Sequence, residues 1–199
     1  MNIPFIFNVT NNKDEDRGAR VSAITNAHFN NTKVSLTNEL RGSPAKGFWV
    51  AGVSNYSGDY KGIEVAGIFN YSGDYKGIKV AGLFNEAGGD FEGIQIAGIN
   101  NFITKDAKGI QIAGITNKID RDLEGVSYGT ISNHAKSNGK IAIQIGAFNH
   151  IKEYNPEGLV IQLGISNRAG NQSIPFLNIR GLGNLFKKKG NDLESKIQA

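Results

Sequence analysis

The sequence contains no cysteine and no long apolar run. Without thiols, disulfides, thiolate metal sites and a cysteine nucleophile are excluded. No apolar stretch approaches the roughly 20 residues that a membrane-spanning helix needs. Residues 3–7 are apolar, but this run is too short for a signal-peptide core and lacks a basic start and a cleavage pattern. We therefore expect a cytoplasmic protein, or a cell-surface or periplasmic one if an export signal has been removed.

Acidic residues are fewer than basic ones, 18 against 22, which gives a formal net charge of +4. Much of the excess lies in the lysines at 187–189. A basic cluster can contact nucleic acid, but at a polar chain end it is typical of a solvated tail. We interpret residues 181–199 as a polar, basic C-terminal tail and do not expect a nucleic-acid partner.

Glycine, in contrast, is abundant, with 26 residues that recur at fixed offsets beside isoleucine and valine. The block from Tyr56 to Ile63 returns unchanged from Tyr71 to Ile78. The best units read Gly-Ile-Gln-Ile-Ala-Gly-Ile-x-Asn, followed by a polar stretch. Each unit closes on an asparagine, at Asn55, Asn70, Asn85, Asn101, Asn117, Asn133, Asn149 and Asn167. The spacing of 15 or 16 residues, 18 at the end, indicates a repeat architecture.

Two apolar positions in each unit are separated by one mostly polar position. The first is occupied by Phe48, Ile63, Ile78, Ile94, Ile110 and Val126, and the second by Val50, Val65, Val80, Ile96, Ile112 and Tyr128. The position between them holds Trp49, Glu64, Lys79, Gln95, Gln111 and Ser127. This alternation predicts a short strand. We expect its apolar positions to be buried and the intervening position to face solvent.

The alternation breaks at the Ala-Gly pair, because the next apolar position comes three residues later. In one continuous strand a three-residue step would place the two apolar sets on opposite faces. A corner at Ala-Gly restores them to one side, and glycine suits a tight corner. Identical asparagines from successive coils would then lie about 4.8 Å apart and hydrogen-bond as a ladder, if the coils stack in parallel.

The sequence therefore predicts an all-β fold, a parallel β-solenoid of about eight coils of 15–16 residues. The alternative is an antiparallel up-and-down β-meander or barrel, whose best evidence is hairpin-like turn chemistry such as Asn138-Gly139. We assign residues 1–46 to N-terminal strands or a cap and residues 47–180 to the repeat array. Residues 173–179 would close the sheet, with Pro175 at its edge.

The tandem Gly-Ile-Gln-Ile-Ala-Gly-Ile-x-Asn units at 93–101 and 109–117 resemble the leptospiral-type surface repeat-containing family. The segment Ile-Pro-Phe-Leu-Asn at 174–178 is similar to the closing segment of that family, and the resemblance covers roughly residues 47–180. The resemblance implies a surface-associated protein of unknown biochemical role and supplies no catalytic residues. This chain shows no export signal of the kind that many members carry.

Two sets of polar residues are candidate metal ligands. His134 and His150 follow asparagines of successive units, so they would lie one above the other on the outside, without a third ligand. A column of aspartates would require compensation of its charge, either by Ca²⁺ that bridges the coils or by turn capping, in which each aspartate bonds a backbone N–H of its own turn. Its members are Asp59, Asp74, Asp90, Asp106 and Asp122. We favour turn capping and expect neither a metal nor a cofactor.

An aromatic set supplies the better binding hypothesis, although a cover provided by the N-terminal segment would equally explain it. Its members are Trp49, Tyr56, Phe69, Tyr71 and Phe84. Exposed aromatics on a flat repeat surface suit an unknown protein or carbohydrate partner. The sequence thus favours a non-enzymatic structural or interaction repeat protein. The alternatives are a membrane-associated β-barrel component, the only reading that implies membrane insertion, and a glycan-active β-helix enzyme.

Overall fold

The computed structural model describes residues 19–21, 27–29, 32–40 and 45–183, with side chains from residue 45 onward. Sixteen strands are present in these residues. They are β1 (Ala19–Val21), β2 (Ala27–Phe29), β3 (Thr32–Leu40), β4 (Ala45–Ser57), β5 (Tyr60–Ala66), β6 (Phe69–Ser72), β7 (Tyr75–Ala81), β8 (Phe84–Ala87), β9 (Phe91–Ala97), β10 (Asn100–Ile103), β11 (Ala107–Ala113), β12 (Thr116–Gly129), β13 (Ser132–Ile145), β14 (Phe148–Glu153), β15 (Leu159–Ala169) and β16 (Gln172–Arg180).

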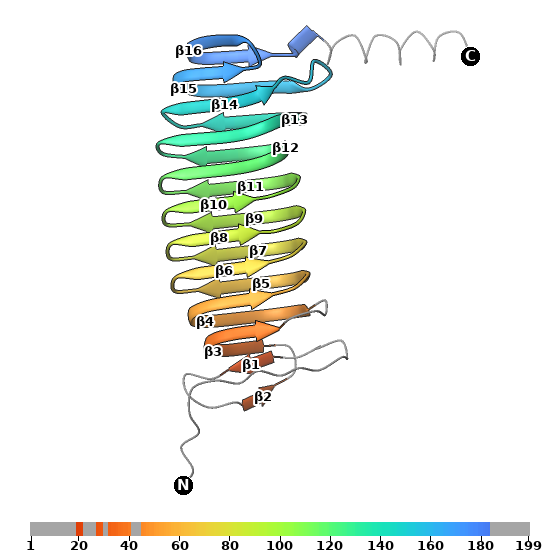
Figure 1. The fold of residues 1–199 in the computed structure, drawn as a ribbon, viewed down its shortest axis with the longest axis vertical. Helices are drawn as coiled ribbons and strands as arrows, with labels where there is room; N and C mark the ends of the chain where they lie inside the picture. The colour runs from red at the N-terminus through yellow and green to blue at the C-terminus, as the bar shows by residue number, and fades with distance from the viewer. Residues whose placement is uncertain (1–18, 22–26, 30–31, 41–44, 184–199) are drawn as a thin grey trace, which may run out of the picture.

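The chain winds into coils that stack in a nearly straight column (Figure 1). A typical coil contains one long strand and one short strand, such as β7 and β8, joined by a corner at Gly82 and Leu83. Equivalent strands of successive coils pair in parallel and in register, so that Ile78 lies opposite Ile94 and Asn85 opposite Asn101. The predicted parallel β-solenoid with corners at Ala-Gly is confirmed, and the antiparallel up-and-down alternative is wrong for these coils.

The supposed hairpin turn at Asn138-Gly139 lies inside β13. The register between β12 and β13 shifts at this point, where extra residues enter the coil. Asn138 holds the irregular segment in place, because its Nδ2 donates to the carbonyl of Asn155 at 3.2 Å and its Oδ1 accepts from the N–H of Asn155 at 2.8 Å. Turn-forming residues thus accommodate an insertion here without reversing the chain.

The predicted asparagine ladder is present and runs from Asn55 to Asn167. Each Nδ2 donates to the Oδ1 of the next asparagine, with distances of 2.8–3.1 Å. The same amide also donates to a carbonyl of the next long strand, as Asn101 does to Ile112 at 2.7 Å. Every asparagine from Asn55 to Asn149 therefore joins its own coil to the one above it, and this satisfies the buried amides.

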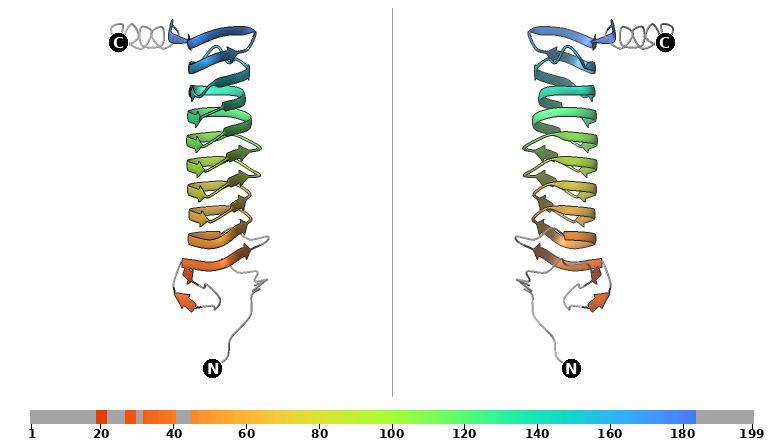
Figure 2. Two further views of the ribbon diagram at one scale, coloured as in Figure 1. Left: turned by 90° about the vertical axis from the view of Figure 1, so that its left-hand side faces the viewer. Right: turned by 90° about the vertical axis from the view of Figure 1, so that its right-hand side faces the viewer.

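The prediction of which side chains are buried is wrong for the long strands. The isoleucine and valine columns face outward, and the column between them faces inward, where Glu64, Lys79, Gln95 and Gln111 are fully buried. The alternation has the predicted period but the opposite phase. The interior lies between two thin layers, one of long and one of short strands (Figure 2), and alanine occupies the inward position beside the corner, as at Ala66 and Ala81. The space between the layers is narrow, so it accommodates small or hydrogen-bonded side chains. The two columns of branched isoleucine and valine side chains would not fit there as well.

The apolar core lies at the far end of each coil, next to the second corner. It contains an aromatic column, in which the rings of Tyr60, Tyr75 and Phe91 stack at centroid distances of 5.6 and 5.7 Å. Across the interior, Ile103, Ile119 and other small or branched side chains face this column. Stacked rings of this kind bury much apolar area in each coil.

One glycine column shows how closely the coils approach. Gly93 has a φ of +142°, which side-chain-bearing residues rarely adopt, and a Cβ atom there would overlap the carbonyl oxygen of Gly77 in the preceding coil. Gly62, Gly77, Gly109 and Gly125 share this geometry, so the glycine at this position of the regular coils is required by the stacking itself.

The described array ends in a reversed strand. β16 pairs antiparallel with β15, and Pro175 lies at the register shift between the two. Ile179 is opposite Ile161 and Leu177 is opposite Leu163. At the other end, β3 pairs in parallel with β4. The predicted tail from residue 184 onward and most of the N-terminal segment lie outside the described residues.

Candidate functional site

Four of the five predicted binding residues lie together on the outer face of the short-strand layer. We call Tyr56, Phe69, Tyr71 and Phe84 the aromatic platform. Tyr56 and Tyr71 are opposite each other in β4 and β6, and their rings stack with centroids 4.4 Å apart and planes inclined by 15°. Phe69 and Phe84 are opposite each other in β6 and β8, in the neighbouring outward column. The coil repeat thus aligns two columns of rings on one rigid surface.

The fifth predicted residue, Trp49, is not part of this surface. Only 2% of its surface is exposed, and its ring lies edge-on to Tyr60 with centroids 5.0 Å apart. Trp49 occupies the same inward column as Glu64. The sequence prediction placed this column on the outside, so the assignment of Trp49 to a binding surface is wrong for the same reason.

Sequence reasoning missed Phe102, which continues the column of Tyr56 and Tyr71. In β10 it follows the ladder Asn101, as Tyr71 follows Asn70, and Glu86 lies between the two aromatics in the stack. The ammonium group of Lys118 lies 4.6 Å from the centroid of the Phe102 ring. A search of every residue that follows a ladder asparagine would have found Phe102 and Lys118.

The two predicted histidines are stacked on the same outer face, beyond Lys118. The rings of His134 and His150 have centroids 4.8 Å apart and are inclined by 15°. Burial lowers the pKa of both, and nearby cations add to the effect, chiefly Lys118 for His134. Within the described part of the chain, no group of three His, Cys, Asp or Glu residues is placed to hold a metal ion.

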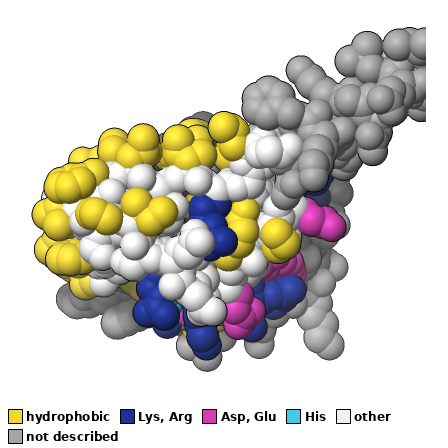
Figure 3. Space-filling model, turned by 90° about the horizontal axis from the view of Figure 1, so that it is seen from above, with side chains coloured by type: hydrophobic (Ala, Val, Ile, Leu, Met, Phe, Trp, Pro, Cys, Tyr) yellow, Lys and Arg dark blue, Asp and Glu magenta, His cyan; other side chains and the backbone are white. Residues whose placement is uncertain are grey.

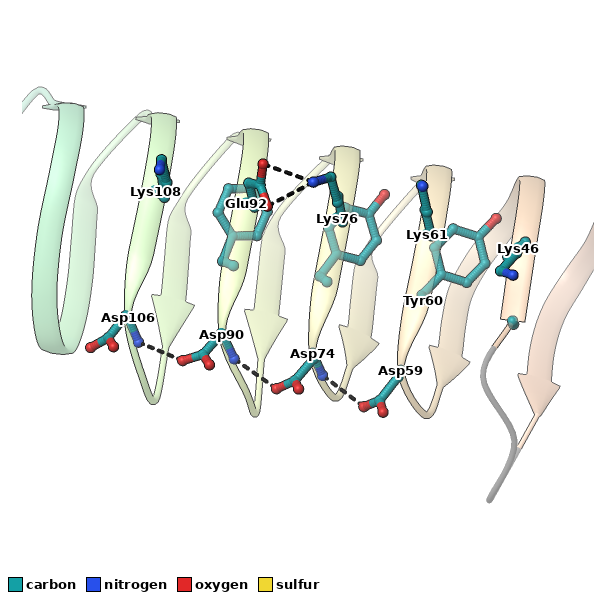
Figure 4. A pocket seen from close by; sticks show the side chains of 13 residues that line it. Lys46, Asp59, Tyr60, Lys61, Asp74, Lys76, Asp90, Glu92, Asp106 and Lys108 are labelled. Carbon is teal, nitrogen blue, oxygen red and sulfur yellow. Dashed lines mark hydrogen bonds and ion pairs between the residues drawn. The ribbon is translucent and has the colours of Figure 1, made fainter.

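The aspartate column lies along the second corner, where Figure 4 shows the carboxylates in a row. The Oδ1 of each aspartate accepts a hydrogen bond from the backbone N–H of the next aspartate in the column. The N–H of Asp74 donates to Asp59 at 2.9 Å, and the N–H of Asp122 donates to Asp106 at 3.2 Å. The predicted capping of each aspartate's own turn is therefore wrong, because these backbone bonds link successive coils. A carboxylate that accepts an N–H in this way gains local compensation for its charge.

A shallow groove of about 440 Å³ runs between this aspartate row and a row of outward lysines. Lys76 spans two coils in it, because its Nζ lies 2.9 Å from both carboxylate oxygens of Glu92 (Figure 4). Lys105 and Arg121 lie 3.6 and 3.3 Å from carboxylates of the row, those of Asp74 and Asp106. The opposite charges are thus largely arranged to hold neighbouring coils together, although exposed pairs of this kind add little stability.

The inward polar column changes character along its length. Glu64 and Lys79 form a buried ion pair, Gln95 and Gln111 follow, and further along the Nε2 of Gln162 donates to the Oε1 of Gln144 at 2.8 Å. The amide atoms of Gln95 and Gln111 make no hydrogen bond in this structure. Burial raises the pKa of Glu64 to about 7 and lowers that of Lys79 to about 8, while the attraction between them opposes both shifts.

No family model, curated protein or solved structure matches this chain. The resemblance of its repeat to leptospiral-type surface repeats therefore stays a prediction. Among the residues that the structure describes, none belongs to a helix that is long and apolar enough to cross a membrane.

Proposed function

We propose that this protein is a non-enzymatic interaction scaffold that binds a protein partner through the aromatic platform. The observation that carries the proposal is the pair of ring columns, with Tyr56 stacked on Tyr71 and Phe69 opposite Phe84. Tyrosine is enriched among the residues that dominate binding energy at protein interfaces, and aromatics are enriched in interfaces generally. Because the repeat resembles leptospiral-type surface repeats, we also propose that the scaffold is presented at a cell surface.

The orientation of the rings favours a protein over a glycan. Tyr56 and Tyr71 stack face to face along the column of coils, so each covers one face of the other. What they offer outward is mainly ring edges and phenol hydroxyls. Such groups suit apolar side chains and backbone carbonyls of a polypeptide, whereas a sugar ring would require an open aromatic face.

The scaffold can hold the platform without further ordering on binding. The ladder bonds from Asn55 to Asn70 and from Asn70 to Asn85, at 2.8 and 2.9 Å, lie directly beneath the platform strands. A preorganised surface loses little conformational entropy when it binds, which favours affinity. The carboxylates and histidines of the predicted alternative sites are engaged in hydrogen bonds and ring stacking between successive coils.

The test is selection of peptide ligands from a displayed library on the intact protein. Binding of the selected peptides is then measured to Phe69→Asn/Phe84→Asn. Asparagine is a native residue in this column, at Asn100 opposite Phe84, so the change should leave the coil intact. Loss of two aromatic contacts at about 1–2 kcal/mol each predicts a weakening of roughly 30-fold to 1,000-fold for the pair.

The matched control is Phe148→Asn, a substitution in the same outward column but away from the platform. This variant should bind the peptides as the native protein does. Equal binding by all three proteins would contradict the proposal. Capture of oligosaccharides by the native protein, lost in Phe69→Asn/Phe84→Asn, would instead support the carbohydrate alternative.

A further inference from the structure

The outer face of the long-strand layer has three outward columns, and two of them are apolar along their whole height. We call these two columns the Ile/Val face. The third column, next to the second corner, is charged and contains Lys61, Lys76, Glu92 and Lys108. The first column contains Phe48, Ile63, Ile78, Ile94, Ile110, Val126, Ile143 and Ile161, and the second contains Val50, Val65, Val80, Ile96, Ile112, Tyr128, Ile145 and Leu163. None of these side chains is charged. A third apolar column follows at the corner, with Ile68, Leu83 and Ile115 among its members.

These side chains are exposed to a similar degree from coil to coil. Ile63, Ile78, Ile96, Ile110 and Ile112 each expose 36–40% of their surface. Seen along the column of coils, apolar side chains line one flank of the perimeter, and the charged side chains gather away from it (Figure 3). A contiguous apolar surface of this extent is typical of an interaction site.

The closing strand extends this face. Ile179 and Leu177 of β16 continue the two columns beside Ile161 and Leu163, although β16 runs in the opposite direction. Both side chains are exposed. The end of the described array thus preserves the apolar columns and leaves them uncovered.

The area of the face is sufficient for a specific interface. Eight long strands about 4.8 Å apart give a height of roughly 38 Å, and the two columns with the corner column span about 16 Å. The footprint is then roughly 600 Å² for one copy. Two copies would together bury about 1,200 Å², which is at the lower end of the range for specific protein interfaces.

The regular spacing of side chains on the Ile/Val face indicates which kind of surface can pack against it. The side chains of the face form ridges that repeat at the coil spacing, with nearly the same residue in each step, as in Ile63, Ile78 and Ile94. A second sheet interdigitates with these ridges over many steps only if it has the same spacing and is equally straight. Another copy of this chain has both properties, and because the face carries no charge, it does not repel its own image.

We propose that the Ile/Val face is a homodimer interface, in which the long-strand layers of two copies pack face to face. The two apolar faces would form a second core about 10 Å thick between the solenoids. The aromatic platform is on the opposite layer and stays accessible in such a dimer. The proposal is therefore independent of the function proposed above.

Sedimentation equilibrium of the full chain tests the proposal, at loading concentrations from about 1 to 200 μM. The native protein should approach twice the 21.4 kDa chain mass. The variant Ile78→Lys/Ile112→Lys introduces a lysine into each column and should raise the dissociation constant by about 100-fold or more. Its far-UV circular dichroism should match that of the native protein, because both positions are already exposed.

The matched control is Phe84→Lys/Phe148→Lys, which makes the same change at exposed positions of the short-strand layer. It should dimerise normally while losing the peptides selected by the platform. A monomeric native protein at the highest concentration would overturn the proposal. So would a folded Ile78→Lys/Ile112→Lys that stays dimeric, or a monomeric native protein that co-sediments with phosphatidylcholine vesicles, which would assign the face to lipid.

Discussion

Glu64 and Lys79 occupy the same inward position in successive coils, and their carboxylate Oε2 and ammonium Nζ lie 3.6 Å apart. Both side chains are wholly buried. Ser57 donates to the other carboxylate oxygen at 3.1 Å, and Lys79 donates to the carbonyl of Glu86 at 2.8 Å. The sequence therefore introduces one ion pair into a column whose next two members are the uncharged Gln95 and Gln111. Such a pair loses hydration on burial, and its attraction must offset that loss.

We predict that the two residues are strongly coupled in stability. Lys79→Gln leaves a buried carboxylate without its cation and should destabilise the protein by about 3–5 kcal/mol. Glu64→Gln should have a similar effect through the unpaired ammonium group. The double variant reproduces the glutamine column of the following coils, so its stability should lie within about 1 kcal/mol of the native value or above it. Urea denaturation followed by circular dichroism measures all four proteins, and additive losses would contradict the coupling.

The same pair predicts a minimum in stability near neutral pH. The pKa of Glu64 rises from 4.5 to about 7 on folding, so its favourable contribution is present below pH 4.5 and is lost as the pH rises to 7. The pKa of Lys79 falls from 10.5 to about 8, so its contribution is present above pH 10.5 and is lost as the pH falls to 8. Relative to Glu64→Gln/Lys79→Gln, the native protein should be least stable between pH 7 and 8.

Urea midpoints of both proteins at about pH 5, 7.5 and 9.5 test this prediction. The double variant serves as the control, because every other titrating group is common to the two proteins. The difference in unfolding free energy should favour the double variant most at pH 7.5 and less on either side. A difference that does not change with pH would show that the pair does not titrate as these pKa values require.

The fold could be predicted because the repeat specifies its own stacking. Asparagines spaced 15 or 16 residues apart form a continuous ladder only when the coils are parallel and in register. The burial of the long strands could not be obtained in the same way. Alternation separates Ile63 from Glu64 but does not say which of them faces inward, and the general preference for buried isoleucine selects the wrong side here.

Other residues indicated which side of the long strands faces inward. Ala66 has the same inward orientation as Glu64, and a column of alanine indicates a space too narrow for larger side chains. The sequence predicted all four platform residues, but it wrongly added Trp49 to them and did not reveal Phe102 in the adjoining stack. Trp49 was assigned to the outside with the rest of its column, and Phe102 was overlooked because Glu86 interrupts the aromatic column.

We predict that one ladder asparagine contributes more to stability than its outward neighbour. Asn101→Ala removes hydrogen bonds to Asn85, to Asn117 and to the carbonyl of Ile112, at 3.1, 2.9 and 2.7 Å. At about 1 kcal/mol for each bond the loss should be about 2–4 kcal/mol. The control is Asn100→Ala in the same strand, whose side-chain oxygen makes no hydrogen bond in this structure and which should change stability by about 0.5 kcal/mol or less. Equal losses in the two variants, measured by urea denaturation, would contradict a stabilising ladder.

Finally, Trp49→Ala should act on stability, since this ring is buried against Tyr60. Loss of so large a core side chain leaves a cavity and should cost about 3–5 kcal/mol, whereas Tyr56→Ala on the outer face should cost about 1 kcal/mol or less. Trp49 is the only tryptophan, so its fluorescence reports on the coil around β4 in the native protein. In a repeat protein the ends can unfold before the middle, so this signal should change at the same urea concentration as circular dichroism or at a lower one. A Trp49→Ala variant with an unchanged urea midpoint would place the ring outside the core.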